Sequence, residues 1–145
     1  MAEPKGFTVM DAAYLAGLID GDGYVGILRR RTRKTRSGFS YYAEMDLSSV
    51  HPTFLQEIQS LVGAGCWRRV NRGFKSQRPL YHLKMGPNAL RWLLPLLIPH
   101  MKLKRRQAII VLEHLGTMAK GRHGQSPASE ARYLELRKMN HRGSV

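Results

Sequence analysis

The sequence predicts an α+β fold, in which helices and antiparallel β-hairpins occupy separate stretches of the chain. Three observations predict it: an apolar run of helical composition near the start, two pairs of strand-like segments around turn residues, and a second half rich in helical periodicity. At 145 residues and 43% hydrophobic, the chain is long enough for one domain with a sizeable core. We expect a single domain over 1–145, with its main body at about 8–115 and a loop and helix over 116–145.

Local signals place each element in the order α-β-β-α-β-β-α-α-α. Thr8 and Asp11 form a near capping box before the first helix, which we expect Gly21 and Gly23 to end. Proline begins two later helices, at Pro52 and after Ser126, because a first helical turn tolerates it. The expected elements are a helix over 9–20, strands over 24–33 and 39–49, a helix over 52–62, strands over 66–70 and 80–85, a short helix from 87, a helix over 104–115 and a last helix from 127.

Positive charge dominates the composition: 24 Lys and Arg against 10 Asp and Glu leave a net charge of +14. Such a surface favours a polyanionic partner, with nucleic acid first and an anionic membrane surface second, although a merely soluble basic surface is the simpler reading. The basic residues form three clusters: Arg29, Arg30, Arg31, Arg33, Lys34 and Arg36; Arg68, Arg69, Arg72, Lys75 and Arg78; and Lys102, Lys104, Arg105 and Arg106.

Other classes are excluded by what the composition lacks. The apolar runs fall short of the ~20 residues that a membrane-spanning helix needs. One cysteine, Cys66, and scattered histidines cannot supply a zinc quartet. With a single cysteine and no charged-then-apolar leader, we expect an intracellular protein, in a prokaryotic cytoplasm or an organelle.

The stretch "YLAGLIDGDGYVGI", residues 14–27, carries the most specific signal. On a helix, Ala13, Gly17 and Gly21 form one stripe of very small side chains. Two helix backbones can approach closely along such a stripe, and the simplest partner is the same helix of a second chain across a two-fold axis. The alternative is that the stripe packs against its own domain, and spacing alone favours that alternative.

Two aspartates follow where this helix is expected to end. The Asp22 carboxylate, the Gly21 carbonyl and the negative end of the helix dipole are features that suit Mg²⁺. If two helices pair along the stripe, the two Asp22 side chains meet near the axis, where two metal-bound carboxylates can clamp a phosphodiester. The simpler reading of "DGDG" is an ordinary acidic turn.

"LAGLIDGDG", Leu15 to Gly23, resembles the LAGLIDADG signature of homing endonucleases at eight of nine positions, with Gly21 in place of Ala. The segments "GYVGI", "HPTFLQEIQSLVGAG", "KLKRRQA" and "LRKMNHRG" extend the resemblance to the single-motif branch of the family. The resemblance implies an αββαββα core with additional C-terminal helices, dimerised through the motif helices, whose antiparallel sheets form a saddle over DNA. It also implies a Mg²⁺- or Mn²⁺-dependent endonuclease of intron mobility that cuts both strands of a long, near-palindromic site and leaves 3′ overhangs. Relatives of this fold that bind without cutting, namely intron RNA maturases and transcription regulators, provide the alternative function.

The resemblance also implies roles for individual residues. Asp22 matches the metal-binding acid, Gly21 the position whose carbonyl reaches the metal, and Asp20 a mostly structural acid at the helix end. Lys104 matches an active-site lysine, with a phosphate-contacting lysine as an equal alternative.

At the end of the second strand, relatives often place a polar residue over a metal-bound water. This chain has "DLSSV" there, and Ser49 is the nearest match, with Ser48 or Asp46 as alternatives.

The same resemblance assigns two surfaces. The expected dimer interface is Ala13, Ala16, Gly17, Asp20 and Gly21. Strands in the major groove read base edges, while Lys and Arg at loops meet phosphates. Alternation places Arg29, Arg31 and Arg33 on one face and Arg30 on the other, and one of the two sets should face DNA. The expected DNA-binding residues are Arg29, Arg30, Arg31, Arg33, Lys34, Arg36, Ser40, Tyr42, Glu44, Arg68, Arg69, Arg72, Lys75, Gln77 and Arg78.

Overall fold

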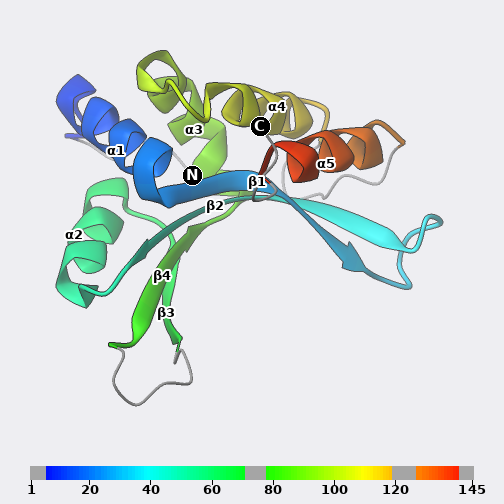
Figure 1. Ribbon diagram of the computed structural model, residues 1–145. Coiled ribbons are helices and arrows are strands. Elements are labelled where there is room, and N and C mark those ends of the chain that lie inside the picture. Colours follow the sequence, from blue (N-terminus) through cyan, green and yellow to red (C-terminus); the bar gives the residue numbers. More distant parts are fainter. Residues whose placement is uncertain (1–5, 71–77, 119–126, 141–145) are drawn as a thin grey trace.

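The computed structural model describes residues 6–70, 78–118 and 127–140 (Figure 1). Its elements are α1 (Val9–Asp22), β1 (Gly23–Arg31), β2 (Phe39–Ser49), α2 (Pro52–Val62), β3 (Cys66–Val70), β4 (Leu80–Met85), α3 (Pro87–Leu97), the 3₁₀ turn η1 (Ile98–His100), α4 (Arg105–Gly116) and α5 (Pro127–Asn140). The strands form one antiparallel sheet in the order β1-β2-β4-β3. This confirms the expected α+β class and the expected order of elements.

The first helix begins where the capping box predicts. The Thr8 hydroxyl accepts from the Asp11 N–H at 3.1 Å, and the Asp11 carboxylate accepts from the Thr8 N–H at 2.9 Å. α1 ends at Asp22, two residues later than expected, because Gly21 stays helical and Gly23 adopts the extended conformation. A Cβ at Gly23 would lie 2.7 Å from the Ile19 Cα and 3.1 Å from the Asp46 carbonyl oxygen, so only glycine allows this tight exit.

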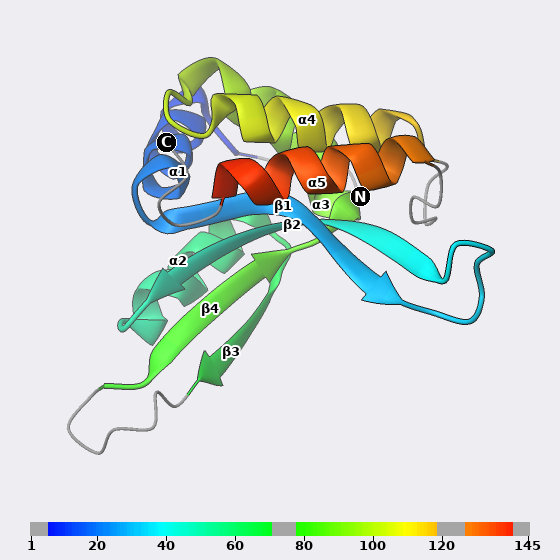
Figure 2. The same cartoon turned by 45° about the vertical axis from the view of Figure 1, so that its right-hand side comes forward.

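The sheet has one covered face and one open face. α1, α3, α4 and α5 lie over one side of it, and α2 packs beside β2 and β4 (Figures 1 and 2). Along β2 the odd-numbered residues point to the covered side: Tyr41, Ala43, Met45 and Leu47 are buried. Even-numbered residues of the same strand therefore point to the open face, because side chains alternate along a strand.

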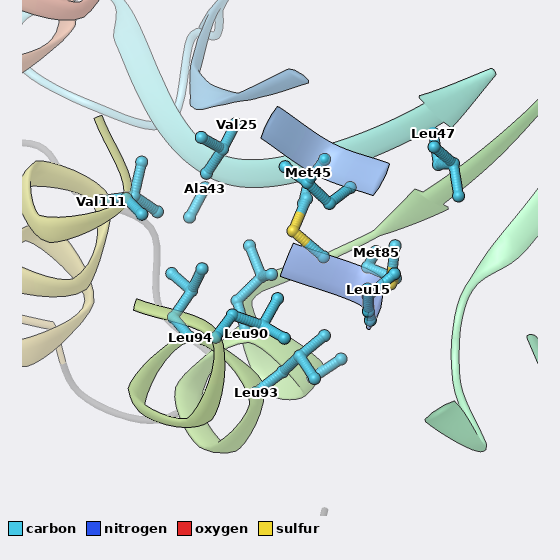
Figure 3. Packing of buried hydrophobic residues seen from close by; sticks show 14 of the residues in the cluster. Leu15, Val25, Ala43, Met45, Leu47, Met85, Leu90, Leu93, Leu94 and Val111 are labelled. Carbon is cyan, nitrogen blue, oxygen red and sulfur yellow. The ribbon is translucent and has the colours of Figure 1, made fainter. Parts of the chain in front are cut away.

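The hydrophobic core fills the space between the covered face and the helices (Figure 3). α1 contributes Leu15 and Ile19, both fully buried. α3 contributes a row of leucines, and it runs for 11 residues rather than as the short helix expected, continuing into η1. α5 joins the same core through Leu136. In the described residues no helix is long and apolar enough to cross a bilayer.

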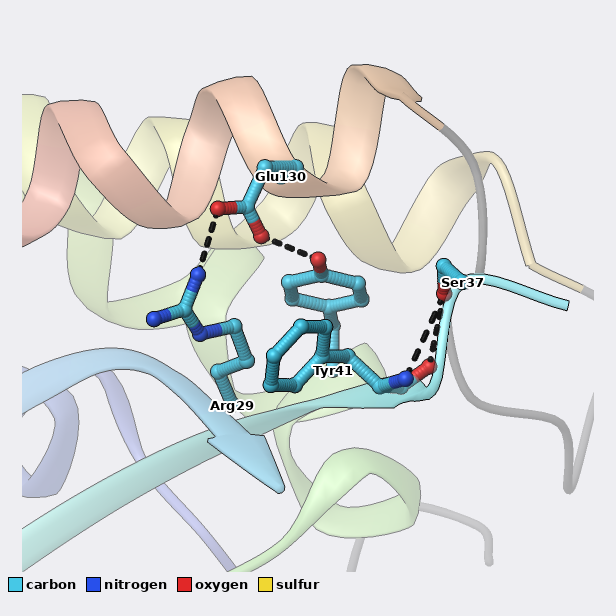
Figure 4. Close-up of polar contacts among 5 residues, drawn as sticks. Arg29, Ser37, Tyr41 and Glu130 are labelled. Atoms are coloured by element: carbon cyan, nitrogen blue, oxygen red, sulfur yellow. Dashed lines mark hydrogen bonds and ion pairs between the residues drawn. The ribbon is translucent and has the colours of Figure 1, made fainter. Parts of the chain in front are cut away.

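Polar contacts of Glu130 with Arg29 and Tyr41, called the polar staple below, join α5 to the sheet (Figure 4). Glu130 accepts a hydrogen bond from the Arg29 guanidinium at 2.5 Å and another from the Tyr41 hydroxyl. The Arg29 guanidinium also stacks at 4.6 Å from the ring centres of Phe39 and Tyr133. Burial and the bond to Glu130 raise the pKa of the Tyr41 hydroxyl to about 12. Arg29 was expected to bind DNA; instead it lies on the covered face, because the register pairs it with the buried Tyr41. There Glu130, 101 residues later in the chain, accepts its hydrogen bond.

Removing the staple should destabilise the domain. Glu130→Ala leaves a half-buried guanidinium and a buried hydroxyl without their carboxylate, and we expect a loss of about 1–3 kcal/mol in the free energy of unfolding. Glu135→Ala is the matched control, because Glu135 lies on the same helix in an exposed 3.5 Å pair with Arg106 and should cost under about 1 kcal/mol. Urea denaturation of both variants makes the comparison, and equal losses would show that the staple adds nothing.

Candidate functional site

The candidate site begins at the C-terminal end of α1. Asp22 is the last residue of the helix, and both its side chain and Gly21 are exposed. A Cβ at Gly21 would meet no atom within 4 Å, so the protein leaves open space around this backbone. The last carbonyls of a helix have no partner within the helix and carry the negative end of its dipole. A carboxylate and carbonyl oxygens therefore gather at one exposed point.

Lys104 lies against this helix end. Its ammonium donates to the carbonyl oxygens of Ile19 at 2.9 Å, Asp20 at 3.1 Å and Gly23 at 2.7 Å. An ammonium has three N–H donors, so all three are engaged by the backbone of α1 and its exit. Burial lowers the pKa of the Lys104 amine, against the opposing effect of the Asp20 and Asp22 carboxylates. The sequence-predicted lysine thus lies beside the predicted metal-binding acid, held in place as a cap on the helix.

Asp20 also joins the end of α1 to the segment before α4, here with the side chain of α1 as the acceptor. Its carboxylate accepts from the backbone N–H of Lys102 at 2.6 Å and of Lys104 at 3.0 Å. Burial alone would raise the pKa of this carboxyl, but the N–H groups of Lys102, Lys104 and Leu103 outweigh it and lower the pKa below its ordinary value. Asp20 was also expected at the dimer interface; its carboxylate is instead directed at its own chain, because the N–H groups before α4 need an acceptor.

The stripe on α1 is exposed in part. Ala13, Gly17 and Gly21 are exposed, and a Cβ at Gly17 would meet no atom within 4 Å. The helix also exposes Met10 and Tyr14, at 83% and 55%. Ala16 was expected at the dimer interface, but it is fully buried in the core of its own chain. It directly precedes Gly17 and so points to a different side of the helix.

Ser49 ends β2. Its hydroxyl oxygen accepts from the His51 N–H at 3.0 Å, at the turn into α2. Directly opposite Gly23, at the end of α1, the register places Leu47, which is buried and apolar. The residue in register with the end of the helix is therefore not polar, and Ser49 lies two positions further along.

The donor set suits a hard divalent cation only in part. Within the described ranges, no group of three or more His, Cys, Asp or Glu side chains could hold a metal ion. One chain offers the Asp22 carboxylate and nearby carbonyl oxygens, which are hard ligands of the kind that Mg²⁺ takes. Mg²⁺ is usually held by one or two carboxylates together with substrate phosphates, so this set fits the ion when a second chain and a phosphate complete it.

The open face of the sheet carries polar side chains in register. Arg30 pairs with Ser40, which is buried, and the Arg30 guanidinium lies 5.0 Å from the ring centre of Tyr42. Glu44 follows on the same strand, and Arg68 faces the same side from β3. These predicted DNA-binding residues share one surface without a covering helix.

The remaining predicted DNA-binding residues have other positions. Arg33, Lys34 and Arg36 are exposed in the turn between β1 and β2, and Arg78 is exposed just before β4. Arg31 and Arg69 are exposed at positions that alternate with the open face. Arg72, Lys75 and Gln77 lie outside the described residues.

Four polar residues of the open face were not among the predicted DNA-binding residues: Asp46, Ser48, His82 and Lys84. His82 and Lys84 face the open side with Asp46 and Ser48, because the β2–β4 register pairs Asp46 with Lys84 and Ser48 with His82. The alternation in "LYHLKM" could have indicated both residues, because its leucine and methionine at positions 83 and 85 mark the buried side.

Asp20→Asn should reduce stability in a pH-dependent way. A carboxyl whose pKa is lowered on folding contributes stability above its ordinary pKa, near 3.8, and loses it as the pH falls through the lowered value. We expect a loss of about 1–2 kcal/mol at pH 7 that shrinks below about pH 4. Thermal or urea unfolding from pH 3 to 7 measures this, with the exposed Glu57→Gln as control; a pH-independent difference would contradict the proposed anchor.

No protein-family model and no curated protein sequence matches the chain. Solved structures do match. The homing endonuclease I-CvuI in complex with the I-CreI target has a TM-score of 0.76 at 20% identity, covering 94% of this chain and 86% of that one. The archaeal intron-encoded homing endonuclease I-Vdi141I complexed with DNA has a TM-score of 0.74 at 18% identity, covering 92% and 86%.

A third structure, the LAGLIDADG homing endonuclease I-SmaMI bound to cleaved DNA, has a TM-score of 0.73 at 15% identity. It is matched over 99% of this chain but only 48% of its own length, so this chain spans about half of it. The chain carries the nine-residue motif at the end of α1, in the arrangement of helices and strands that these structures share. The protein therefore has the LAGLIDADG homing endonuclease fold.

Proposed function

We propose that the protein is a LAGLIDADG homing endonuclease: a homodimer that cuts both strands of a long, near-palindromic DNA site with a divalent metal ion, Mg²⁺ or Mn²⁺, and leaves 3′ overhangs. The observation that carries the proposal is the exposed Asp22 carboxylate, located at the end of a helix whose small-residue stripe is also exposed. The exposed Asp22 carboxylate is placed to bind a cation, whereas the Asp20 carboxylate is already engaged by the N–H groups of Lys102 and Lys104.

The exposed stripe supports the homodimer. Gly17 and Gly21 leave the α1 backbone bare, while Met10 and Tyr14 add exposed apolar area along the same helix. A two-fold contact along this stripe would cover that area and bring two copies of Asp22 together. Each chain would then supply one carboxylate to a shared site. Of the five predicted interface residues, Ala13, Gly17 and Gly21 are the ones placed for the contact.

DNA would lie against the open face of the sheet. The net charge of +14 suits a phosphate backbone, and exposed arginines lie at the hairpin turn, where a strand passing along the groove meets phosphates. Arg30, Tyr42, Glu44 and Arg68 lie within the face, where base edges would be met.

The chemistry would take place between the two helix ends. A bound divalent ion supplies a polarised water and stabilises charge on the phosphate. Asp22 and the Gly21 carbonyl would hold it, and the Lys104 ammonium would fix the helix end and add positive charge beside the phosphate. The Ser49 hydroxyl accepts one bond from His51 and keeps its proton to donate, as a residue that orients water requires.

Asp22→Asn tests the proposal. The change keeps the size of the side chain and removes the charge that would bind the metal, so cleavage should fall by at least about 100-fold. Affinity for the same DNA should stay the same or rise, because like charge near the phosphates is removed. The experiment incubates the protein with randomised duplex DNA and Mg²⁺, sequences both the new ends and the bound fraction, and then compares the variant on the enriched site.

Two outcomes would contradict it. Full cleavage by Asp22→Asn would place the catalytic metal elsewhere. Enriched binding without new ends, in the wild type, would favour a non-cleaving binding protein of the same fold.

Gly17→Leu tests the homodimer. A leucine in the stripe would separate the two helix backbones, at a cost on the order of 1–3 kcal/mol per chain, and sedimentation should show monomer. Gly116→Leu is the matched control: Gly116 is also helical, and a Cβ there also meets nothing within 4 Å, but it lies on α4 away from the stripe. If both variants stay dimeric, the pairing surface is not α1.

A further inference from the structure

Two carboxylates occupy the middle of the open face, in a chain with few acids. Glu44 and Asp46 are two of 10 Asp and Glu against 24 Lys and Arg. They are spaced by two along β2, so both point to the side without helices. Neither lies at a loop; the register places Glu44 opposite Gly26, and Asp46 between Tyr24 and Lys84.

Neighbouring strands contact both carboxylates. The His82 Nδ1 lies 3.1 Å from each Asp46 oxygen and 3.0 Å from the Ser48 hydroxyl. The Lys84 ammonium lies 3.9 Å from Glu44. Asp46 is thus oriented by hydrogen bonds, whereas Lys84 is loosely paired and keeps donors for another group.

Tyr24 and Gly26 shape the floor beside these acids. A Cβ at Gly26 would lie 2.4 Å from the Tyr24 hydroxyl oxygen, so the tyrosine ring lies across the backbone of Gly26. Burial raises the pKa of the Tyr24 hydroxyl, and the charges of Glu44 and Asp46 raise it further. The hydroxyl stays protonated beside the two carboxylates.

Both carboxylates can accept further donors from a partner, because an ionised carboxylate has about four lone-pair sites and the contacts above use only part of them. Against phosphates they would be repelled, but at the centre of a groove they meet base edges, where cytosine N4 and adenine N6 are the donors. Cytosine suits a carboxylate better, because adenine presents its N7 acceptor beside the amine. The guanine paired with that cytosine offers O6 and N7, which accept from a lysine.

We propose that Glu44 and Asp46 are specificity-determining residues that accept hydrogen bonds from cytosine N4 amines, while Lys84 donates to guanine on the opposite strand. This inference rests on the proposed function, because it needs DNA on the open face. Residues spaced by two on a strand lie about 6.6–6.8 Å apart. Base pairs along one DNA strand are spaced by about 3.4 Å. The two carboxylates therefore address base pairs about two steps apart in each half-site.

Selection from randomised duplex DNA with Ca²⁺ in place of Mg²⁺ tests the inference, by comparing wild type with Glu44→Gln, Asp46→Asn and Glu113→Gln. The wild type should enrich two C·G pairs about two steps apart in each half-site. Each open-face variant should change the preference at one position from cytosine towards adenine, which amides contact through N6 and N7, by about tenfold. The control lies on α4, on the other side of the sheet, and should leave the profile unchanged.

A second measurement stays informative if a variant fails to fold. Replacing either C·G pair by T·A in the enriched site exchanges the amine for a carbonyl and should weaken wild-type binding by about tenfold. Unchanged affinity, unchanged profiles in both folded variants, or enrichment of a base without an amine at these positions would overturn this inference alone. A wild type that enriches no sequence would overturn the proposed function and this inference with it.

Discussion

The junction between the end of α1 and the start of α4 is the contact on which the rest of the site depends. Three carbonyl groups at the end of α1 and at its exit, and two N–H groups before α4, meet there. Two side chains form hydrogen bonds with these backbone groups. Lys104 donates to the carbonyls of α1 and its exit, and Asp20 accepts from the N–H groups before α4. Because Asp22 follows directly on this clamped turn of helix, its backbone position is determined by contacts 81–85 residues apart in sequence.

Alternation of side chains gives the two faces of the sheet different roles. One set of side chains on β1 and β2 forms the core and leaves the other set for the open face. A shift of one residue in register would exchange the two sets. Arg29 and Arg30 mark this division: the first is bound by Glu130 of α5, and the second lies over Tyr42. Arg29 therefore helps to attach α5 to the sheet and does not contribute to the basic open face.

Much of the fold could be predicted from local signals. The limits of α2, β2, β3 and β4 follow from proline, glycine and alternation, which act within a few residues. The end of α1 could not, because Gly21 and Gly23 look equivalent in sequence, and only the close approach of Ile19 to Gly23 distinguishes them. The burial of Ala16 is likewise decided by which side of α1 meets the core.

The candidate site could be predicted only as a set of residue types near a helix end. Asp22, Gly21 and Lys104 were indicated by the motif and the resemblance, yet the three carbonyl contacts of Lys104 depend on long-range packing that no local pattern encodes. Two residues of the open face, His82 and Lys84, have the strand alternation as their only sequence signal.

All three N–H donors of Lys104 are engaged by carbonyl oxygens, which bears on the catalytic role proposed for this side chain. With three donors on three carbonyls, its ammonium can contact a phosphate only by giving up or sharing one of those bonds. Its positive charge still acts on a nearby phosphate without such exchange, because Coulomb attraction does not require a hydrogen bond. Loss of this lysine would remove both the charge and the cap, so a defect in cleavage alone cannot separate a catalytic from a positioning role. The two roles separate only when helix-end stability is measured on the same variant, because a charge acting on phosphate contributes nothing to folding in the absence of DNA.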